Sequence, residues 1–162
     1  MKTLILYYSL EGYTKKLAEA LAEELGTDIE RVLAVKEINP KGIRKFLWGG
    51  RQAMMGKTPA IEDLRSDFET YDLILVGSPV WAFTFAPPIK TVIEQGKLKG
   101  KKVAYFCTHE GGLGKTLDKF MDAVSKESTV IDSIDFLNDK KDILIRKEKA
   151  IEWAKKCMVE IE

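Results

Sequence analysis

The sequence predicts an α/β fold in which a five-stranded parallel sheet is covered by helices on both faces. Short apolar runs typical of buried strands alternate with segments of helical periodicity along the whole chain. No repeat, low-complexity tract or long linker divides the 162 residues, a length that suits one domain with a full hydrophobic core. We therefore expect a single doubly wound domain over residues 1–162.

The first expected strand and helix form the clearest pair in the chain. Residues 4–8 are apolar and aromatic, as in a strand buried on both faces. From Thr14 onward, apolar residues recur at helical spacing as far as Leu25, and Gly26 is a suitable end for the helix. The chain between the two elements is therefore a tight turn from a strand into a helix.

The remaining elements are expected to continue this alternation. Further strands are predicted over residues 28–35, 72–77, 102–108 and 128–136. Helical segments are predicted over residues 43–55 (with a break at Gly49-Gly50), from 87 or 88 to 96, from 113 to 124, and from about 146 onward.

Charge and cysteine content exclude several classes of protein. The 26 basic and 25 acidic residues leave a net charge of +1, without the basic excess of a nucleic-acid binder. No apolar run approaches the length of a membrane span, and the N-terminus has no secretory cleavage site. Cys107 and Cys157 form no Cys-x-x-Cys pair, and the lone His109 cannot build a metal site with them. We expect a cytoplasmic protein with reduced cysteines.

Three connections have the composition of a ligand site. In an open parallel sheet, ligands collect beyond the carboxyl ends of the strands. The connections that follow the first, third and fourth expected strands all lie at that edge. They cover residues 9–14, 78–88 and 108–114.

The first connection carries Ser9, Gly12 and Thr14 at a helix N-terminus. Unpaired backbone N–H groups and the positive end of the helix dipole suit a phosphate there. No lysine precedes Thr14 in this turn, so dipoles and hydrogen bonds would neutralise the phosphate. The alternative is that the two hydroxyls only cap the helix.

The second and third connections suit a flat ligand. Trp81, Phe83 and Phe85 are large aromatic residues that either cover such a ligand or fold back as loop anchors. The glycines at 111, 112 and 114 would let a planar ring approach the backbone closely.

Taken together, the three motifs resemble the FMN-binding loops of the flavodoxin family. They are Ser-x-Glu-Gly-x-Thr at 9–14, Gly-Ser-Pro-Val-Trp at 77–81 and Thr-x-x-Gly-Gly at 108–112. The resemblance covers essentially the whole chain. It implies the strand order 2-1-3-4-5 and one non-covalently bound FMN, whose redox chemistry belongs to the cofactor.

The resemblance also implies roles for individual residues. The phosphate would be wrapped by Ser9, Leu10, Glu11, Gly12, Tyr13 and Thr14. The ribityl chain and the ring system would lie along Ser78, Pro79, Val80, Trp81 and Ala82, with Trp81 as the nearest ring neighbour. The pyrimidine edge would face Thr108, Glu110, Gly111 and Gly112. No metal and no separate catalytic residue is implied.

Two functions remain open within this resemblance. One is an electron carrier between partner proteins. The other is a reductase that takes hydride from NAD(P)H and passes electrons to a quinone or similar acceptor. The chain departs from many carriers because residues 79–85 contain no glycine to flip beside the flavin N5, and because its net charge of +1 is not acidic.

Several surface residues have two interpretations. His109 could donate a proton or a hydrogen bond to the flavin or a substrate, or it could simply be solvated. Residues Arg44, Lys45, Arg51 and Lys57 could meet an anionic partner or a nucleotide phosphate, or form the wet face of a helix. The region around Trp48 could support a homodimer.

Overall fold

The computed structural model describes residues 1–37, 58–138 and 143–161, and in these ranges it has the predicted α/β architecture. The strands are β1 (Thr3–Tyr7), β2 (Asp28–Arg31), β3 (Leu73–Trp81), β4 (Thr84–Phe85), β5 (Lys102–His109) and β6 (Thr129–Leu137). The helices are α1 (Tyr13–Leu25), α3 (Pro87–Glu94), α4 (Thr116–Val124) and α5 (Ile143–Val159), with a short 3₁₀ turn η1 (Phe68–Thr70).

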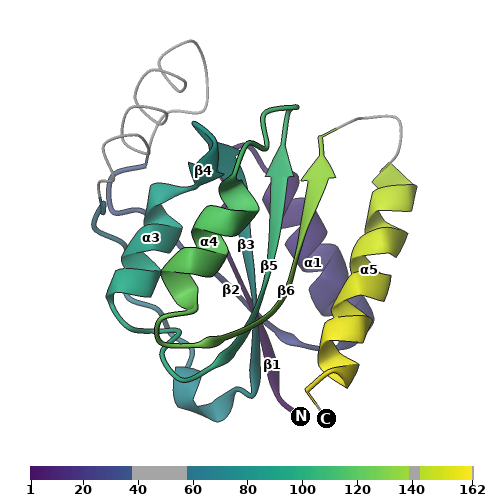
Figure 1. Ribbon diagram of the computed structural model, residues 1–162, viewed down its shortest axis with the longest axis horizontal. Helices are drawn as coiled ribbons and strands as arrows, with labels where there is room; N and C mark the ends of the chain where they lie inside the picture. The colour runs from purple at the N-terminus through teal and green to yellow at the C-terminus, as the bar shows by residue number, and fades with distance from the viewer. Residues whose placement is uncertain (38–57, 139–142, 162) are drawn as a thin grey trace.

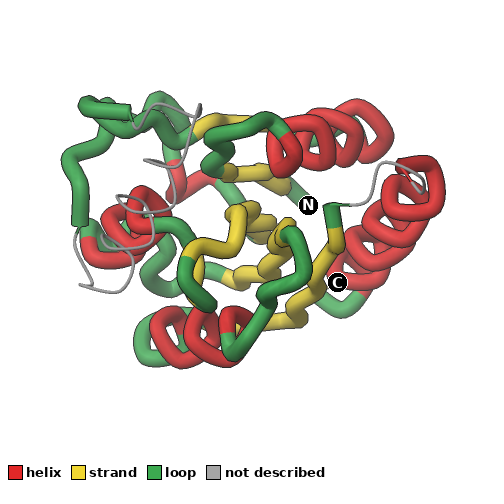
Figure 2. Tube along the Cα trace, turned by 90° about the horizontal axis from the view of Figure 1, so that it is seen from above, coloured by secondary structure: helices red, strands yellow, loops and turns green. Residues whose placement is uncertain are grey.

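The five long strands form a parallel sheet in the order β2-β1-β3-β5-β6. Numbered consecutively, this is the expected order 2-1-3-4-5, so the predicted fold class is confirmed. Helices α3 and α4 cover one face, and α1 and α5 cover the other (Figure 1). Seen from above, the strands lie between these two helical layers (Figure 2). No helix in the described ranges has the length and apolar character needed to cross a bilayer.

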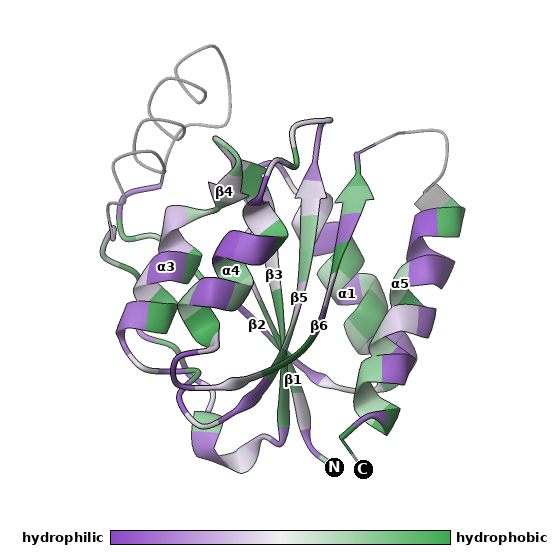
Figure 3. Cartoon of the chain, in the orientation of Figure 1, coloured by the Kyte–Doolittle hydropathy of each residue, from purple (hydrophilic) through white to green (hydrophobic). Residues whose placement is uncertain are grey.

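Alternate residues of each central strand supply two separate cores. In β1, Leu4 and Leu6 point into the core beneath α3 and α4, whereas Ile5 and Tyr7 point into the core beneath α1 and α5. Burial on both faces explains why the strand is apolar throughout instead of alternating. Figure 3 shows the consequence, with hydrophobic colour on the sheet and hydrophilic colour on the outer faces of the helices.

Besides the end of β3, three element boundaries differ by three residues or more from those predicted. Strand β2 ends at Arg31 instead of residue 35, because the following chain turns to bond with residues 60–62 through Val35 N–H and Glu62 N–H. Helix α4 begins at Thr116, whose hydroxyl donates to the Leu113 carbonyl. Helix α5 begins at Ile143, one turn before the predicted start. The predicted helical segment 43–55 lies outside the described residues.

The largest correction concerns the chain after the third strand. Residues 78–81 were expected in a loop, but they extend β3, and β4 folds back antiparallel against them. The turn between the two strands places Ala82 and Phe83 at φ of 47° and 60°. Residues other than glycine and asparagine rarely adopt this backbone region, so the sequence gives no signal of a turn at these two positions.

Candidate functional site

The first connection holds an open helix N-terminus. Gly12 is the N-cap of α1, with φ of 97°, and no side chain caps the helix. Ser9 Oγ instead accepts a hydrogen bond from Gly12 N–H at 3.1 Å, inside the turn. The idea that Ser9 and Thr14 merely cap α1 is therefore wrong. The first N–H groups of a helix have no intrahelical acceptor, so this terminus is able to bind an anion.

A buried hydroxyl pair joins the first connection to the end of β5. Thr14 Oγ1 and Thr108 Oγ1 lie 2.9 Å apart, although the residues are 94 positions apart in sequence. Both side chains are buried. The strand order places β3 between β1 and β5, so this contact crosses the central strand at the carboxyl edge of the sheet. Two of the three predicted connections therefore meet at one point.

The β3–β4 hairpin satisfies its own polar groups. Ser78 is fully buried, and its Oγ donates to the Pro79 carbonyl at 2.8 Å and accepts from Ala86 N–H at 2.9 Å. Phe85 packs edge-to-face on Phe120 in the core, with ring centroids 5.6 Å apart. Ser78 and Phe85 thus fix the base of the hairpin, and Phe85 is a loop anchor.

Trp81 lies where the hairpin meets the end of β1. Its ring packs edge-to-face against Tyr8, with centroids 5.6 Å apart and an interplanar angle of 85°. Tyr8 is fully buried and donates its phenolic hydrogen bond to Glu37. Burial raises the pKa of Tyr8, and the Glu37 carboxylate raises it further. Trp81 itself is only partly buried, so part of an aromatic surface at this edge is accessible to a ligand.

Phe83 projects from the hairpin turn toward the third connection. Its side chain is 58% exposed. A Cβ added at Gly114 would lie 2.7 Å from the Cβ of Phe83, and one added at Gly112 would lie 3.4 Å from its ring. At least Gly114 is therefore small because a ring belonging to the protein packs against it. Lys119 Nζ, from α4, donates to the Phe83 carbonyl at 2.9 Å and holds the turn there.

Both ring nitrogens of His109 are bonded within the chain. Gly111 N–H donates to Nδ1 at 3.1 Å, so Nδ1 is an acceptor and the proton of the neutral ring is on Nε2. The Nε2 atom lies 3.0 Å from Asp135 Oδ2, which accepts its hydrogen bond. The His109 side chain is 9% exposed, so it is not the solvated loop residue considered as an alternative. In this arrangement it shapes the third connection and has no ring nitrogen left for a ligand.

Sequence reasoning missed one residue at this edge. Arg31, the last residue of β2, donates from its guanidinium to the Ser9 carbonyl at 2.7 Å. In the sequence it ends the run Asp28-Ile29-Glu30-Arg31, which has three charged residues and one apolar residue and gives no functional signal. Only the pairing of β2 beside β1 places it at the first connection.

The predicted site residues thus occupy one edge of the sheet in different environments. Ser9, Thr14, Ser78 and Thr108 are buried. Partly buried are Leu10, Gly12, Tyr13, Pro79, Val80, Trp81 and Ala82, and exposed are Glu11, Glu110, Gly111 and Gly112. The strand order defines a doubly wound protein, a class in which ligands bind at the carboxyl edge of the sheet, where the open turn at α1 lies.

Comparisons with known proteins agree with this description. The flavodoxin family model matches residues 2–156. An NAD(P)H dehydrogenase (quinone) of Gluconacetobacter diazotrophicus is 31% identical over 151 residues, which cover 83% of this chain and 71% of that protein. The crystal structure of a flavoprotein in complex with FMN from Lactobacillus acidophilus NCFM is similar with a TM-score of 0.73 and 34% identity, over 83% of this chain and 92% of that one.

A more distant structure shares the fold alone. It is a flavodoxin from the domain Archaea, with a TM-score of 0.57 and 18% identity, over 98% of this chain and 99% of that one. The chain belongs to the flavodoxin family, and the resemblance seen in the three sequence motifs is confirmed.

Proposed function

We propose that this protein binds FMN non-covalently at the carboxyl edge of its sheet and carries electrons between partner proteins. The observation that carries the proposal is the open N-terminus of α1, bonded to β5 through Thr14 and Thr108, with a partly exposed Trp81 packed on Tyr8 just before the same connection. An unpaired helix terminus and an accessible aromatic face at one edge fit a phosphorylated planar group. Bound FMN supplies the reversible electron chemistry.

The residues of the chain have distinct tasks in this proposal. The N–H groups at the start of α1 and the hydroxyls of Ser9 and Thr14 hold the phosphate. The hairpin from Ser78 to Ala82 lies along the ring system, where Trp81 covers the ring and excludes water. His109 holds the turn at Gly111, so the backbone of residues 110–112 presents a fixed edge to the pyrimidine side.

A second function has one specific observation in its favour. Relatives at 31% identity are named NAD(P)H dehydrogenase (quinone), and in this function the chain would accept hydride from NAD(P)H and reduce a quinone or similar small acceptor. The net charge of +1 and the glycine-free hairpin also differ from an acidic carrier. Both functions suit a cytoplasmic protein with two unpaired thiols. The possible dimer region around Trp48 lies outside the described residues.

Anaerobic stopped-flow mixing of the FMN-loaded protein with NADPH and with NADH separates the two functions. Loss of flavin absorbance within seconds, followed by recovery on adding a soluble quinone, supports the reductase. A flavin that nicotinamides leave oxidised, but that a reduced partner protein or photoreduction reduces, supports the carrier. A purified protein that neither contains nor takes up FMN contradicts both.

A further inference from the structure

The connection that would hold the phosphate contains no cation of its own. Between Ser9 and Thr14 the only charged residue is Glu11, whose carboxylate opposes an anion. A helix N-terminus contributes only about half of a positive charge, whereas a phosphate monoester carries close to two negative charges at pH 7. The dipole and hydrogen bonds of the turn therefore offset part of the phosphate charge, and a cation from another element would offset more of it.

Arg31 is the cation that the fold brings to this turn. Its guanidinium donates to the Ser9 carbonyl at 2.7 Å, at the point where β1 leads into the turn. Ser9 is also the residue whose Oγ accepts from Gly12 N–H, so Arg31 and the N-cap of α1 are linked through a single residue. A guanidinium has five N–H donors, and this contact uses one of them.

The charge of Arg31 is not neutralised by a carboxylate. Among the described residues, no Asp or Glu oxygen lies within ion-pair distance of its guanidinium. A backbone carbonyl carries only a partial charge and does not cancel a full one. The field of the guanidinium also reaches the end of β1, because it lowers the pKa of Tyr7 and Tyr8 against the burial that raises both.

We infer that Arg31 is a phosphate-recognition residue of this cofactor site, acting as the charge partner that the first connection lacks. The inference rests on the proposed function, because it assigns the electrostatic partner of the same FMN phosphate. It makes the site selective for the phosphorylated flavin over riboflavin. The exposed end of β2, at the border of the sheet, then contributes to ligand selectivity.

The test compares FMN with riboflavin, which has the same ring and ribityl chain without the phosphate. Both ligands are titrated into apoprotein at pH 7.5 and about 0.1 M ionic strength, where the Debye length is about 10 Å, with quenching of flavin fluorescence as the signal. In Arg31→Gln the Kd for FMN should rise about tenfold, because a charge-assisted contact is lost, while the Kd for riboflavin changes less than about threefold. Arg31→Lys keeps the charge and should recover most of the FMN affinity.

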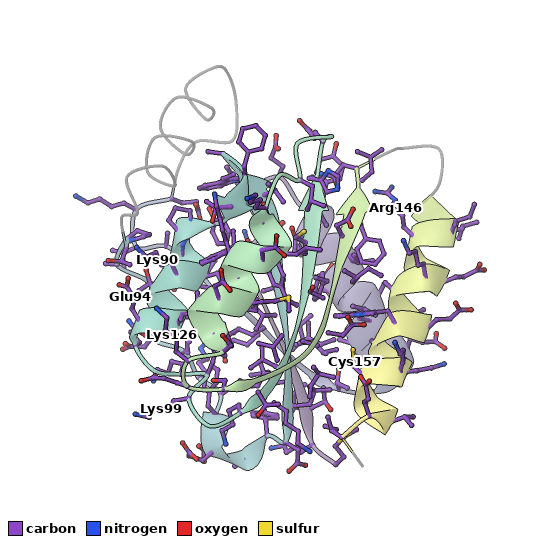
Figure 4. The ribbon with its side chains drawn as sticks, viewed as in Figure 1. Lys90, Glu94, Lys99, Lys126, Arg146 and Cys157 are labelled. Carbon is purple, nitrogen blue, oxygen red and sulfur yellow. The ribbon has the colours of Figure 1, made fainter. Side chains whose placement is uncertain are left out.

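Lys99→Gln is the matched control. It also removes one positive charge, but Lys99 pairs with Glu127 at the opposite end of the molecule, as Figure 4 shows for Lys99. Both Kd values should stay within about twofold, because a charge more than a Debye length away is screened. Arg31→Met serves as a second neutral variant should Arg31→Gln fail to fold, which circular dichroism establishes.

The outcomes separate this inference from the proposed function. Equal weakening of FMN and riboflavin would mean that Arg31 only braces the turn, and that result overturns the inference. Unchanged affinity for FMN in a folded neutral variant overturns it as well. If the unmodified protein binds neither flavin, the proposed function itself fails.

Discussion

The first connection and the β3–β4 hairpin flank the same site and use their polar groups in opposite ways. In the first connection, α1 has no side-chain cap, and its leading N–H groups are left open. In the hairpin, Ser78 uses its hydroxyl as both donor and acceptor within the chain. The first connection leaves backbone N–H groups open for a ligand, whereas the hairpin uses its Ser78 hydroxyl to fix its own conformation. A binding site needs both, because open groups bind well only when a rigid neighbour places them.

The strand that carries the hairpin should be the most sensitive part of the site. A Cβ at Gly77 would lie 2.3 Å from the Phe106 ring, which is fully buried on the neighbouring strand. Gly77→Ala should therefore lower the free energy of unfolding by about 3 kcal/mol, through overpacking. Gly96→Ala is the control, since an added Cβ at Gly96 meets open space and is opposed only by the positive φ of that residue, and it should cost about 1 kcal/mol. Urea denaturation of both variants measures the difference, and equal losses would contradict it.

Removal of an aromatic ring tests whether the hairpin also contacts the ligand. Trp81→Ala should weaken FMN binding by about tenfold or more, because stacking with a flat ring is lost. Phe83→Ala removes a neighbouring aromatic residue that packs against Gly114 instead, and it should weaken binding clearly less. Flavin fluorescence titration compares the two variants. If their Kd values rise equally, Trp81 has no special place beside the ring.

The two serines provide the sharpest contrast between the regions. Ser78→Ala leaves the buried Ala86 N–H without its acceptor, so the apoprotein should lose about 1–2 kcal/mol of stability with little change in FMN affinity. Ser9→Ala should do the reverse, weakening FMN several-fold with a smaller change in stability. Thermal unfolding of the apoprotein and FMN titration are run on both variants. The contrast is contradicted if each serine substitution changes apoprotein stability and FMN affinity to the same degree.

The smallest predicted effect concerns the helical layer that supports the first connection. Cys157 of α5 is fully buried in the core that also contains α1 residues, and burial raises the pKa of its thiol to about 12 from an ordinary value of 9.0. Below pH 9 both the folded and the unfolded chain keep the thiol proton. Above pH 9 only the unfolded chain loses it, so stability should fall as the pH rises from 9 toward 12.

The measurement is denaturant unfolding at about pH 8.5 and about pH 9.8. The unmodified protein should lose about 1 kcal/mol more than Cys157→Ala over this interval, after each protein is compared with itself at pH 8.5. This comparison cancels the packing cost of the substitution and the titration of other groups. Parallel pH profiles for the two proteins would contradict the prediction.

The first connection could be predicted from the sequence because its signal is local. Hydroxyls and a glycine between a buried strand and an amphipathic helix define the turn within six residues, and the alternation of elements predicts which edge it occupies. The sheet order followed from the family resemblance. The residues that the prediction assigned to FMN lie together at this edge, and their contacts with FMN remain a prediction.

The hairpin and the links between connections could not be predicted in the same way. Ala82 and Phe83 adopt positive φ without glycine or asparagine, so the turn has no local signature. The Thr14–Thr108 contact and the position of Arg31 arise only when strands distant in sequence pair side by side. The hydrogen bonds of the two His109 ring nitrogens involve Asp135 of β6 and the backbone of Gly111. Sequence spacing alone does not show that these groups meet.

The packing of Phe83 on Gly114 has a consequence for how this lineage diversifies. A side chain introduced at 114 would lie 2.7 Å from the Phe83 Cβ, an atom that every residue except glycine carries, and the positive φ of Gly114 adds backbone strain. A smaller side chain at 83 therefore makes no room, and a library randomised at both positions should retain glycine at 114 whatever residue stands at 83. This turn would diversify through position 83 alone.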